Sequence, residues 1–256
     1  MYTIGVTNQK GGVAKTTDTI HVAAALADRG HDVLAVDADP QGYLTNRLGF
    51  EAAYRADEPN FATAMNEPTE HDPRKLIVMG SEFDVLPSNV DMFRLVQDLI
   101  ASGWRPRERL QMLFNRLDGY DYVLVDAPPS LGPINDNVLI ATENILVPVE
   151  AEETSKLALE HLLNQVETIE RRYETRIQER GILVSNVDYP LDNEQKAMLE
   201  WYRDTFDGRC PTFVIRSRTA IKRAMRQGHS VFESEEPCDQ IETFDAIAKE
   251  LEQHNE

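Results

Sequence analysis

Residues 4–17, with the sequence IGVTNQKGGVAKTT, constrain the fold of this chain more than any other stretch. They begin as a short apolar strand, pass through a loop with two adjacent glycines, and enter a helix at Lys15. The first backbone N–H groups of a helix have no partner within the helix, and the helix dipole adds partial positive charge there. A strand that leads into a helix through such a loop therefore predicts a phosphate-binding site.

The loop is not of the general nucleotide-binding type G-x-x-x-x-G-K-[ST]. With Lys15 as the motif lysine, that pattern requires glycine at positions 9 and 14, where Gln9 and Ala14 stand. The loop instead matches K-G-G-x-x-K-[ST], a deviant form with an extra lysine, Lys10, ahead of the two glycines. A methyl group at position 14 is harmless if the backbone φ is negative, so we expect a negative φ at Ala14.

Carboxylates follow two further strands. A buried strand predicted over 32–36 leads into Asp37 and Asp39, and an apolar strand over 122–125 leads into Asp126. Ligands of open α/β sheets bind beyond the carboxyl ends of the strands. Mg²⁺ keeps most of its waters and is bound by few protein groups, so carboxylates at this edge suit magnesium binding and water positioning. The first of these loops also contains proline and glycine, so a solvated turn is the alternative for it.

These three segments, read as NQKGGVAKTT, DADPQG and DAPPS, resemble those of the ParA/MinD family of ATPases and look most like its ParA branch, which partitions chromosomes and plasmids. The resemblance covers nearly the whole chain and is most specific at 8–17, 36–42 and 125–130. It implies a doubly wound α/β fold of the P-loop NTPase class, with a mostly parallel sheet and helices on both faces. A chain of 256 residues suits one such domain, spanning 1–256.

The resemblance also implies the roles of the site residues. The implied ligands are ATP or ADP with Mg²⁺, and the loop N–H groups cradle the β-phosphate. Lys15 then contacts the β- and γ-phosphates, while in the family Lys10 reaches across a homodimer to the partner's ATP. Asp39 is implied to position the attacking water. The implied metal-side residues are Thr16, Asp37 and Asp126.

The nucleotide-binding residues that the resemblance implies lie in the loop, and one further candidate, Asn186, is chosen for its place at the end of a predicted strand over 181–186. They are Lys10, Gly11, Gly12, Val13, Ala14, Lys15, Thr16, Thr17 and Asn186. A side-chain amide at the end of a buried strand can pair with an adenine edge, and it can equally cap the strand. Both alternatives stay open for Asn186.

A second informative region is rich in arginine. Residues 209–232 contain no Asp or Glu, although the net charge of the chain is −18. We expect Ser217 or Thr219 to cap a short helix here, with Lys222 and Arg226 on one of its faces. The residues predicted to bind DNA are Arg216, Arg218, Lys222, Arg223 and Arg226.

Three explanations of this basic region compete. It can bind DNA phosphates without reading sequence, it can dock an acidic partner or another face of this acidic protein, or it can be an ordinary solvated helix. In the ParA family the corresponding segment contributes to non-specific DNA binding. A dimer would present the region twice.

Other features exclude functions. No run of about 18 apolar residues exists, and the first strand begins near Met1, so we expect a cytoplasmic protein without a signal peptide. MinD relatives end in a basic membrane-binding helix, whereas the amphipathic segment 240–253 is acidic, so we expect no membrane role. Cys210 and Cys238 lack metal-ligand spacing, which argues against an iron–sulfur site. The acidic, lysine-poor composition suggests adaptation to a salt-rich cytoplasm, as in a halophile.

The chain is thus predicted to be a partition ATPase that dimerises with ATP, binds DNA non-specifically, and hydrolyses ATP when a ParB-type partner stimulates it. It would be associated with the nucleoid. The alternative is a nucleotide-gated adaptor of the same fold that positions a protein cargo without DNA. A metabolic kinase or a cluster-transfer ATPase would need a substrate pocket or paired cysteines that the sequence does not show. For the helix expected over 154–173, the predicted core residues are Leu157, Leu162, Val166 and Ile169.

Overall fold

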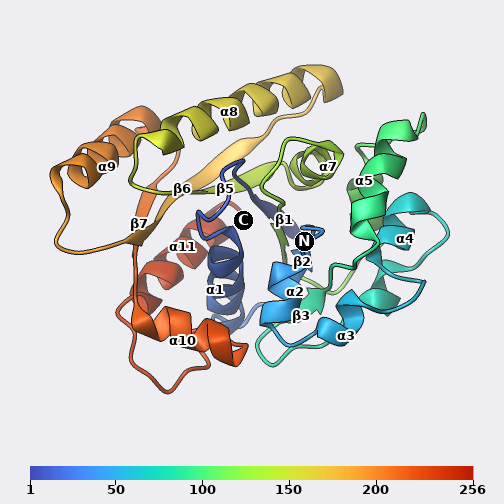
Figure 1. Cartoon of the computed structure of the whole chain (residues 1–256), viewed down its shortest axis with the longest axis horizontal. Helices are drawn as coiled ribbons and strands as arrows, with labels where there is room; N and C mark the ends of the chain where they lie inside the picture. Colours follow the sequence, from blue (N-terminus) through green and yellow to red (C-terminus); the bar gives the residue numbers. More distant parts are fainter. Residues whose placement is uncertain (256) are drawn as a thin grey trace.

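A computed structural model describes residues 1–255 of the chain, and its centre is one seven-stranded sheet (Figure 1). All strand pairs are parallel, in the order β3-β2-β4-β1-β5-β6-β7. The strands are β1 (Tyr2–Val6), β2 (Val33–Asp37), β3 (Asp84–Leu86), β4 (Tyr122–Asp126), β5 (Asn144–Val149), β6 (Gln178–Val187) and β7 (Thr212–Arg216). The predicted doubly wound fold is confirmed, and β1 lies at the point where the chain turns from one half of the sheet to the other.

Helices cover both faces of this sheet. Helices α1 and α11, with buried residues of α2 and α10, form the core on one face, while α4–α9 pack on the other (Figure 1). The helices are α1 (Lys15–Asp28), α2 (Tyr43–Arg47), α3 (Glu51–Tyr54), α4 (Phe61–Asn66), the 3₁₀ helix η1 (Pro73–Leu76), α5 (Met92–Ala101), α6 (Arg109–Phe114), α7 (Pro133–Thr142), α8 (Thr154–Tyr173), α9 (Asn193–Phe206), α10 (Thr219–Gln227) and α11 (Ile241–Gln253).

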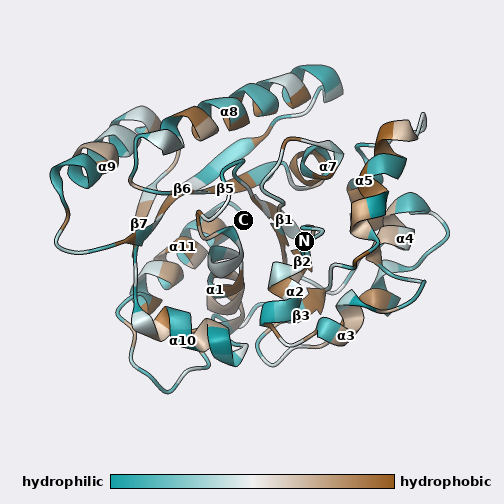
Figure 2. Ribbon diagram, in the orientation of Figure 1, coloured by the Kyte–Doolittle hydropathy of each residue, from teal (hydrophilic) through white to brown (hydrophobic). Residues whose placement is uncertain are grey.

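The two faces of the sheet follow from the alternation of side chains along each strand. In β2, Val33 and Ala35 pack towards α1, while Leu34 and Val36 pack towards α4–α7. Because both faces are covered, β2 and β4 are buried along their whole length and read as continuous apolar runs. Hydropathy changes along α10, which carries both teal and brown segments in Figure 2.

The C-terminal helix α11 uses its apolar face inside the molecule. Phe244, Ile247 and Leu251 are completely buried in the cluster that also contains α1. Arg29, at the end of α1, adds ion pairs of 2.7 Å to both Asp245 and Glu252 of α11. Within residues 1–255, no helix is long and apolar enough to cross a membrane.

One predicted core contact of α8 is wrong. Leu157 is 58% exposed, whereas Leu159 is only 1% exposed. The inward stripe of α8 passes through Leu159, Leu162, Val166 and Ile169, which follow the three- and four-residue spacing of a helix face. Leu157 is two residues away from Leu159 and therefore points to another side of the helix.

Candidate functional site

The predicted phosphate loop joins β1 to α1 at the carboxyl edge of the sheet (Figure 1). The side chain of Asn8 closes its first turn, since its amide donates to the carbonyl of Pro148 (2.6 Å) and its oxygen accepts from the N–H of Lys10 (3.0 Å). Gly12 has φ +81°, a conformation that suits glycine. The loop is thus anchored to β5 and fixed ahead of the helix.

Ala14 departs from the expectation of a negative φ. It is the N-cap of α1 and has φ 69° and ψ 16°, in the left-handed region. The Cβ of an L-residue crowds the following carbonyl there, at a cost of roughly 1–2 kcal/mol. The chain passes from the loop into α1 at this residue, and its backbone adopts a left-handed conformation that alanine disfavours.

Lys15 lies at the start of α1 and is only 7% exposed. Its ammonium group donates to the carbonyl of Lys10 (3.0 Å). Burial lowers the pKa of Lys15, while the nearby carboxylates of Asp126 and Asp39 act in the opposite direction. The charge of this lysine is therefore placed inside the loop, between the ends of β2 and β4.

Thr16 and Asp126 form the part of the site that suits a hydrated magnesium ion. The Thr16 hydroxyl donates to Oδ2 of Asp126 (2.6 Å), and the other carboxylate oxygen, Oδ1, is buried with no hydrogen-bond partner among the described residues. Burial, with the nearby Asp37 carboxylate, raises the pKa of Asp126. A buried acceptor without a donor next to a hydroxyl fits a ligand that brings its own donors, such as metal-bound water.

The carboxylates of the β2 loop have different surroundings. Asp37 is completely buried, and its Oδ2 accepts from the N–H (2.8 Å) and the hydroxyl (2.6 Å) of Thr45. Burial raises the pKa of Asp37. Asp39 is held less tightly, through a bond from the N–H of Gln41 to its Oδ1 (2.9 Å). Sequence reasoning missed Thr45, because a threonine eight residues after an aspartate has no recognisable pattern.

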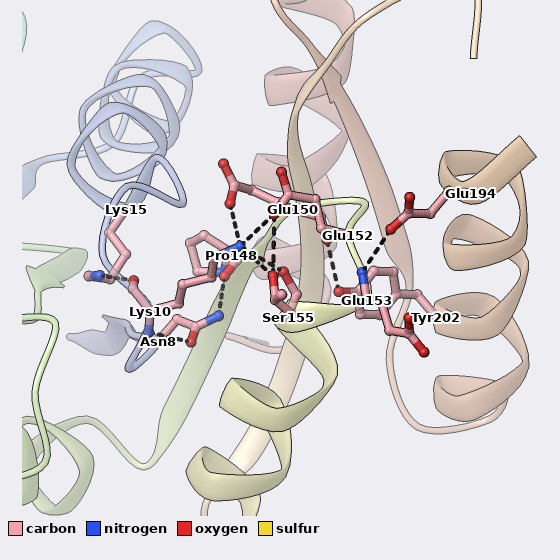
Figure 3. A network of polar contacts seen from close by, with 11 residues as sticks. Asn8, Lys10, Lys15, Pro148, Glu150, Glu152, Glu153, Ser155, Glu194 and Tyr202 are labelled. Atoms are coloured by element: carbon pink, nitrogen blue, oxygen red, sulfur yellow. Dashed lines mark hydrogen bonds and ion pairs between the residues drawn. The ribbon is translucent and has the colours of Figure 1, made fainter. Parts of the chain in front are cut away.

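Lys10 points away from Lys15 and into an acidic pair beyond β5 (Figure 3). Its ammonium group lies 2.7 Å from Oε2 of Glu150 and 2.9 Å from Oε2 of Glu152, and it donates to the hydroxyl of Thr154 (3.1 Å). Burial lowers the pKa of Lys10, but the hydrogen bonds to both glutamates outweigh it and raise the pKa. Sequence reasoning missed Glu150 and Glu152, since two acids after a strand are common.

A cavity of about 260 Å³ opens beside the phosphate loop. On one side it is lined by Thr17, Asp18, Ser185 and Asn186. Asn186 has φ +58° and is exposed, near the end of β6. On the other side the lining comes from the basic region and from α2, namely Arg216, Arg218, Lys222, Arg226 and Arg47. The structure thus brings four of the five predicted DNA-binding residues to the same cavity as Asn186.

The helix of the basic region begins differently from the prediction. The N-cap of α10 is Arg218, and no side chain caps the helix, so the predicted capping by Ser217 or Thr219 is wrong. Arg218 has extended backbone angles, and its guanidinium group turns back to Asp239. Lys222 and Arg226 are exposed, as expected, because the opposite side of α10 is buried.

Cys210 and Cys238 are free thiols, and burial raises the pKa of Cys210 to about 12. Among residues 1–255, no group of three or more His, Cys, Asp or Glu side chains is arranged to hold a metal ion.

Comparison with known sequences gives consistent relatives. A family model described as an AAA domain matches residues 1–179. The chromosome-partitioning ATPase Soj of Thermus thermophilus is 39% identical over 185 residues, which are 72% of this chain and 69% of that protein. The sporulation initiation inhibitor protein Soj of Bacillus subtilis is 29% identical, with 97% of each chain covered. An uncharacterised Mycobacterium tuberculosis protein is 34% identical, and this chain spans 61% of its length.

Solved structures share the fold over almost the whole chain. The ATP complex of Cyanothece McdA has a TM-score of 0.87 at 21% identity, with 98% of this chain and 96% of that chain covered. Cobyrinic acid a,c-diamide synthase from Mycobacterium smegmatis, with bound ADP and magnesium, has a TM-score of 0.78 at 25% identity. That match covers 99% of this chain and 95% of the synthase.

Proposed function

Because this chain belongs to the ParA/MinD family of P-loop ATPases, we propose that it is a partition ATPase that binds and hydrolyses ATP, dimerises in the ATP state and binds DNA non-specifically. We propose further that a ParB-type partner stimulates hydrolysis, in the cytoplasm and on the nucleoid. The observation that carries the proposal is that the phosphate loop and the basic region share one cavity. A nucleotide bound at the loop then contacts the segment proposed to bind DNA.

The loop residues suit ATP. The N–H groups of residues 11–16 would surround the β-phosphate, and Lys15 would supply a buried positive charge. Asn186 and Thr17 line the adjoining cavity, where the nucleoside would extend. A relative of known structure, the M. smegmatis synthase, holds ADP and magnesium.

Magnesium, when bound, would neutralise charge on the β- and γ-phosphates. Thr16 and Asp126 would hold it, with the buried Asp37 close to Asp126. This assignment rests on Oδ1 of Asp126, which has no hydrogen-bond partner within residues 1–255, and on the short hydrogen bond between the two side chains.

The remaining chemistry is positioning. Asp39 is only 6% exposed and is held by one backbone donor, so its second oxygen is left to orient the attacking water. Lys15 balances the charge that spreads over the phosphate oxygens. Lys10 would act on the partner's nucleotide, and to do so it must leave Glu150 and Glu152. Dimerisation would therefore be linked to a rearrangement of this lysine.

A nucleotide-gated adaptor is the second candidate. Arg216, Arg218 and Arg223 each form an ion pair with an acid of their own chain, which favours a structural use of these arginines. The adaptor would keep the nucleotide site and dock a protein cargo. It predicts no DNA binding in any nucleotide state.

DNA binding separates the two candidates. We would measure the fluorescence anisotropy of a labelled non-specific duplex with ATP or ADP across a range of salt. ATP should promote binding, and the double variant Lys222→Glu/Arg226→Glu should lose it. The matched control is Arg171→Glu/Arg172→Glu at the exposed end of α8, which changes the net charge equally. Equal loss in both variants, or no binding with either nucleotide, would refute the partition function.

A further inference from the structure

An acidic segment folds back onto the basic region and neutralises most of its arginines. Residues 233–239, with the sequence ESEEPCD, follow α10. They contain four acidic residues, whereas residues 209–232 contain none. Asp239 accepts two bonds from Arg218, from Nε to Oδ1 (2.7 Å) and from Nη2 to Oδ2 (2.6 Å). Arg216 also donates to Asp239 (3.3 Å). The local excess of positive charge is therefore smaller than the sequence of 209–232 suggests.

A second acid of the acidic segment pairs with α10 itself. Oε2 of Glu236 lies 2.5 Å from Nη1 of Arg223. Lys222 and Arg226, one residue before and three residues after Arg223, have no ion pair among the described residues. Glu235, next to Glu236, is exposed and has no described ion pair either. Among the described residues, the acidic segment therefore forms ion pairs with some basic side chains of this region and leaves others without one.

The pairing of Asp239 imitates the recognition of a phosphate. An arginine fork binds two oxygens of one phosphate in parallel, and Arg218 binds both oxygens of Asp239 in this manner. These hydrogen bonds lower the pKa of Asp239 to about 2, so the carboxylate is charged at neutral pH. Arg216 and Arg218 also line the cavity beside the phosphate loop. Asp239 therefore holds two residues of the cavity wall.

The acidic segment is fixed at both ends and irregular between them. Before it, the N–H of Ser230 donates to Glu82 (2.8 Å), and after it the buried Gln240 accepts from the N–H of Arg216 (2.7 Å). Residues 233–239 form no helix or strand. Asp239 and Glu236 are 50% and 34% exposed, so water and competing anions reach both ion pairs. Displacing the segment would leave its anchors in place.

We propose that the acidic segment 233–239 is an internal competitor for DNA, with Asp239 and Glu236 occupying positions on Arg218 and Arg223 that backbone phosphates would take. This inference rests on the proposed DNA-binding function. DNA binds in full only when the carboxylates give way to phosphates. A nucleotide in the shared cavity contacts Arg216 and Arg218 and so alters the competition.

The test compares charge removal at paired and unpaired acids. The double variant Glu236→Gln/Asp239→Asn keeps the shape of both side chains, and Asn can still accept from Gln240 through Oδ1. The matched control is Glu233→Gln/Glu235→Gln, which removes two charges from the same segment without touching an arginine. We would measure the Kd of each for a labelled non-specific duplex with ATP and with ADP, and verify folding by circular dichroism and thermal unfolding.

We expect the Kd of the paired-acid variant to fall about three- to thirtyfold at low salt, and that of the control to change by less than about twofold. The largest increase in DNA affinity should occur with ADP, where the wild type binds weakly. Adding Arg218→Ala to the paired-acid variant should remove most of this increase in DNA affinity. If wild type binds DNA with ATP but both variants bind equally well, the internal competitor is refuted and the proposed function stands. If no variant binds DNA in either state, the proposed function fails and the inference fails with it.

Discussion

A glycine at position 14 should stabilise the protein. Ala14 has φ 69°, where an L-residue pays roughly 1–2 kcal/mol relative to the right-handed region. Glycine adopts this conformation freely but loses about 0.5–1 kcal/mol more entropy on folding. The net effect of Ala14→Gly should therefore be a gain of about 0.5–1 kcal/mol in the free energy of unfolding. For a chain of this size that is a rise of about 1–3 °C in Tm.

The reverse substitution is a matched control in the same loop. Gly12 has φ +81°, and a Cβ added to it would meet no atom within 4 Å, so Gly12→Ala tests the backbone term without a steric clash. It should lower stability by about 1 kcal/mol. Guanidinium unfolding of both variants without nucleotide measures the two changes. If Ala14→Gly lowers the denaturation midpoint, or if Gly12→Ala leaves it unchanged, the assignment of a left-handed backbone to Gly12 and Ala14 is wrong.

Three other changes have defined outcomes. Burial lowers the pKa of His21 to about 4, so its contribution to stability is intact above pH 6.5 and is lost as the pH falls towards 4, by about 1.4 kcal/mol per pH unit. Between pH 7 and pH 4, the free energy of unfolding of His21→Leu should therefore rise by about 3 kcal/mol relative to that of wild type. Parallel pH profiles of the two proteins in urea unfolding would contradict this. Leu159→Ala should lower the free energy of unfolding by about 2–5 kcal/mol and Leu157→Ala by less than about 0.5 kcal/mol, and equal effects would refute the assignment of the α8 core face. If the net charge of −18 reflects salt adaptation, circular dichroism should show loss of structure on dilution into low salt, and full stability there would refute that hypothesis.

The strands and the position of the site could be predicted from the sequence because their signals are local. β2 and β4 are continuous apolar runs that end in aspartate, and their parallel pairing places Asp37 opposite Asp126 at one edge. The hydroxyl of Thr16 donates to Asp126, so these two residues lie together, while their role toward a metal stays a prediction. The strand pattern was sufficient to place the two aspartates, whereas Thr16 was identified from the match of the loop to the family motif.

Other features depend on contacts that spacing does not encode. Lys10 pairs with Glu150 and Glu152, which lie 140 or more positions away along the sequence. Glu236 and Asp239, which pair with arginines of the basic region, lie shortly after residue 232, and Glu179, which pairs with Arg209, lies 30 positions before it. The charge of residues 209–232 alone therefore overstates the charge of this surface. The conformation of Ala14 was missed because residue preference favours negative φ, whereas the loop requires a left-handed turn.

The most direct test of the central claim, a nucleotide-dependent dimer, is the mass of the protein in solution. We would measure it by light scattering with ATP and with ADP, in an Asp39→Ala background that should slow hydrolysis. The account predicts twice the mass of one chain with ATP and the mass of one chain with ADP. It also predicts that Lys10→Ala stays at one chain with ATP while the control Lys249→Ala still dimerises. The mass of one chain with ATP, in a protein shown to bind a fluorescent ATP analogue, would contradict the account.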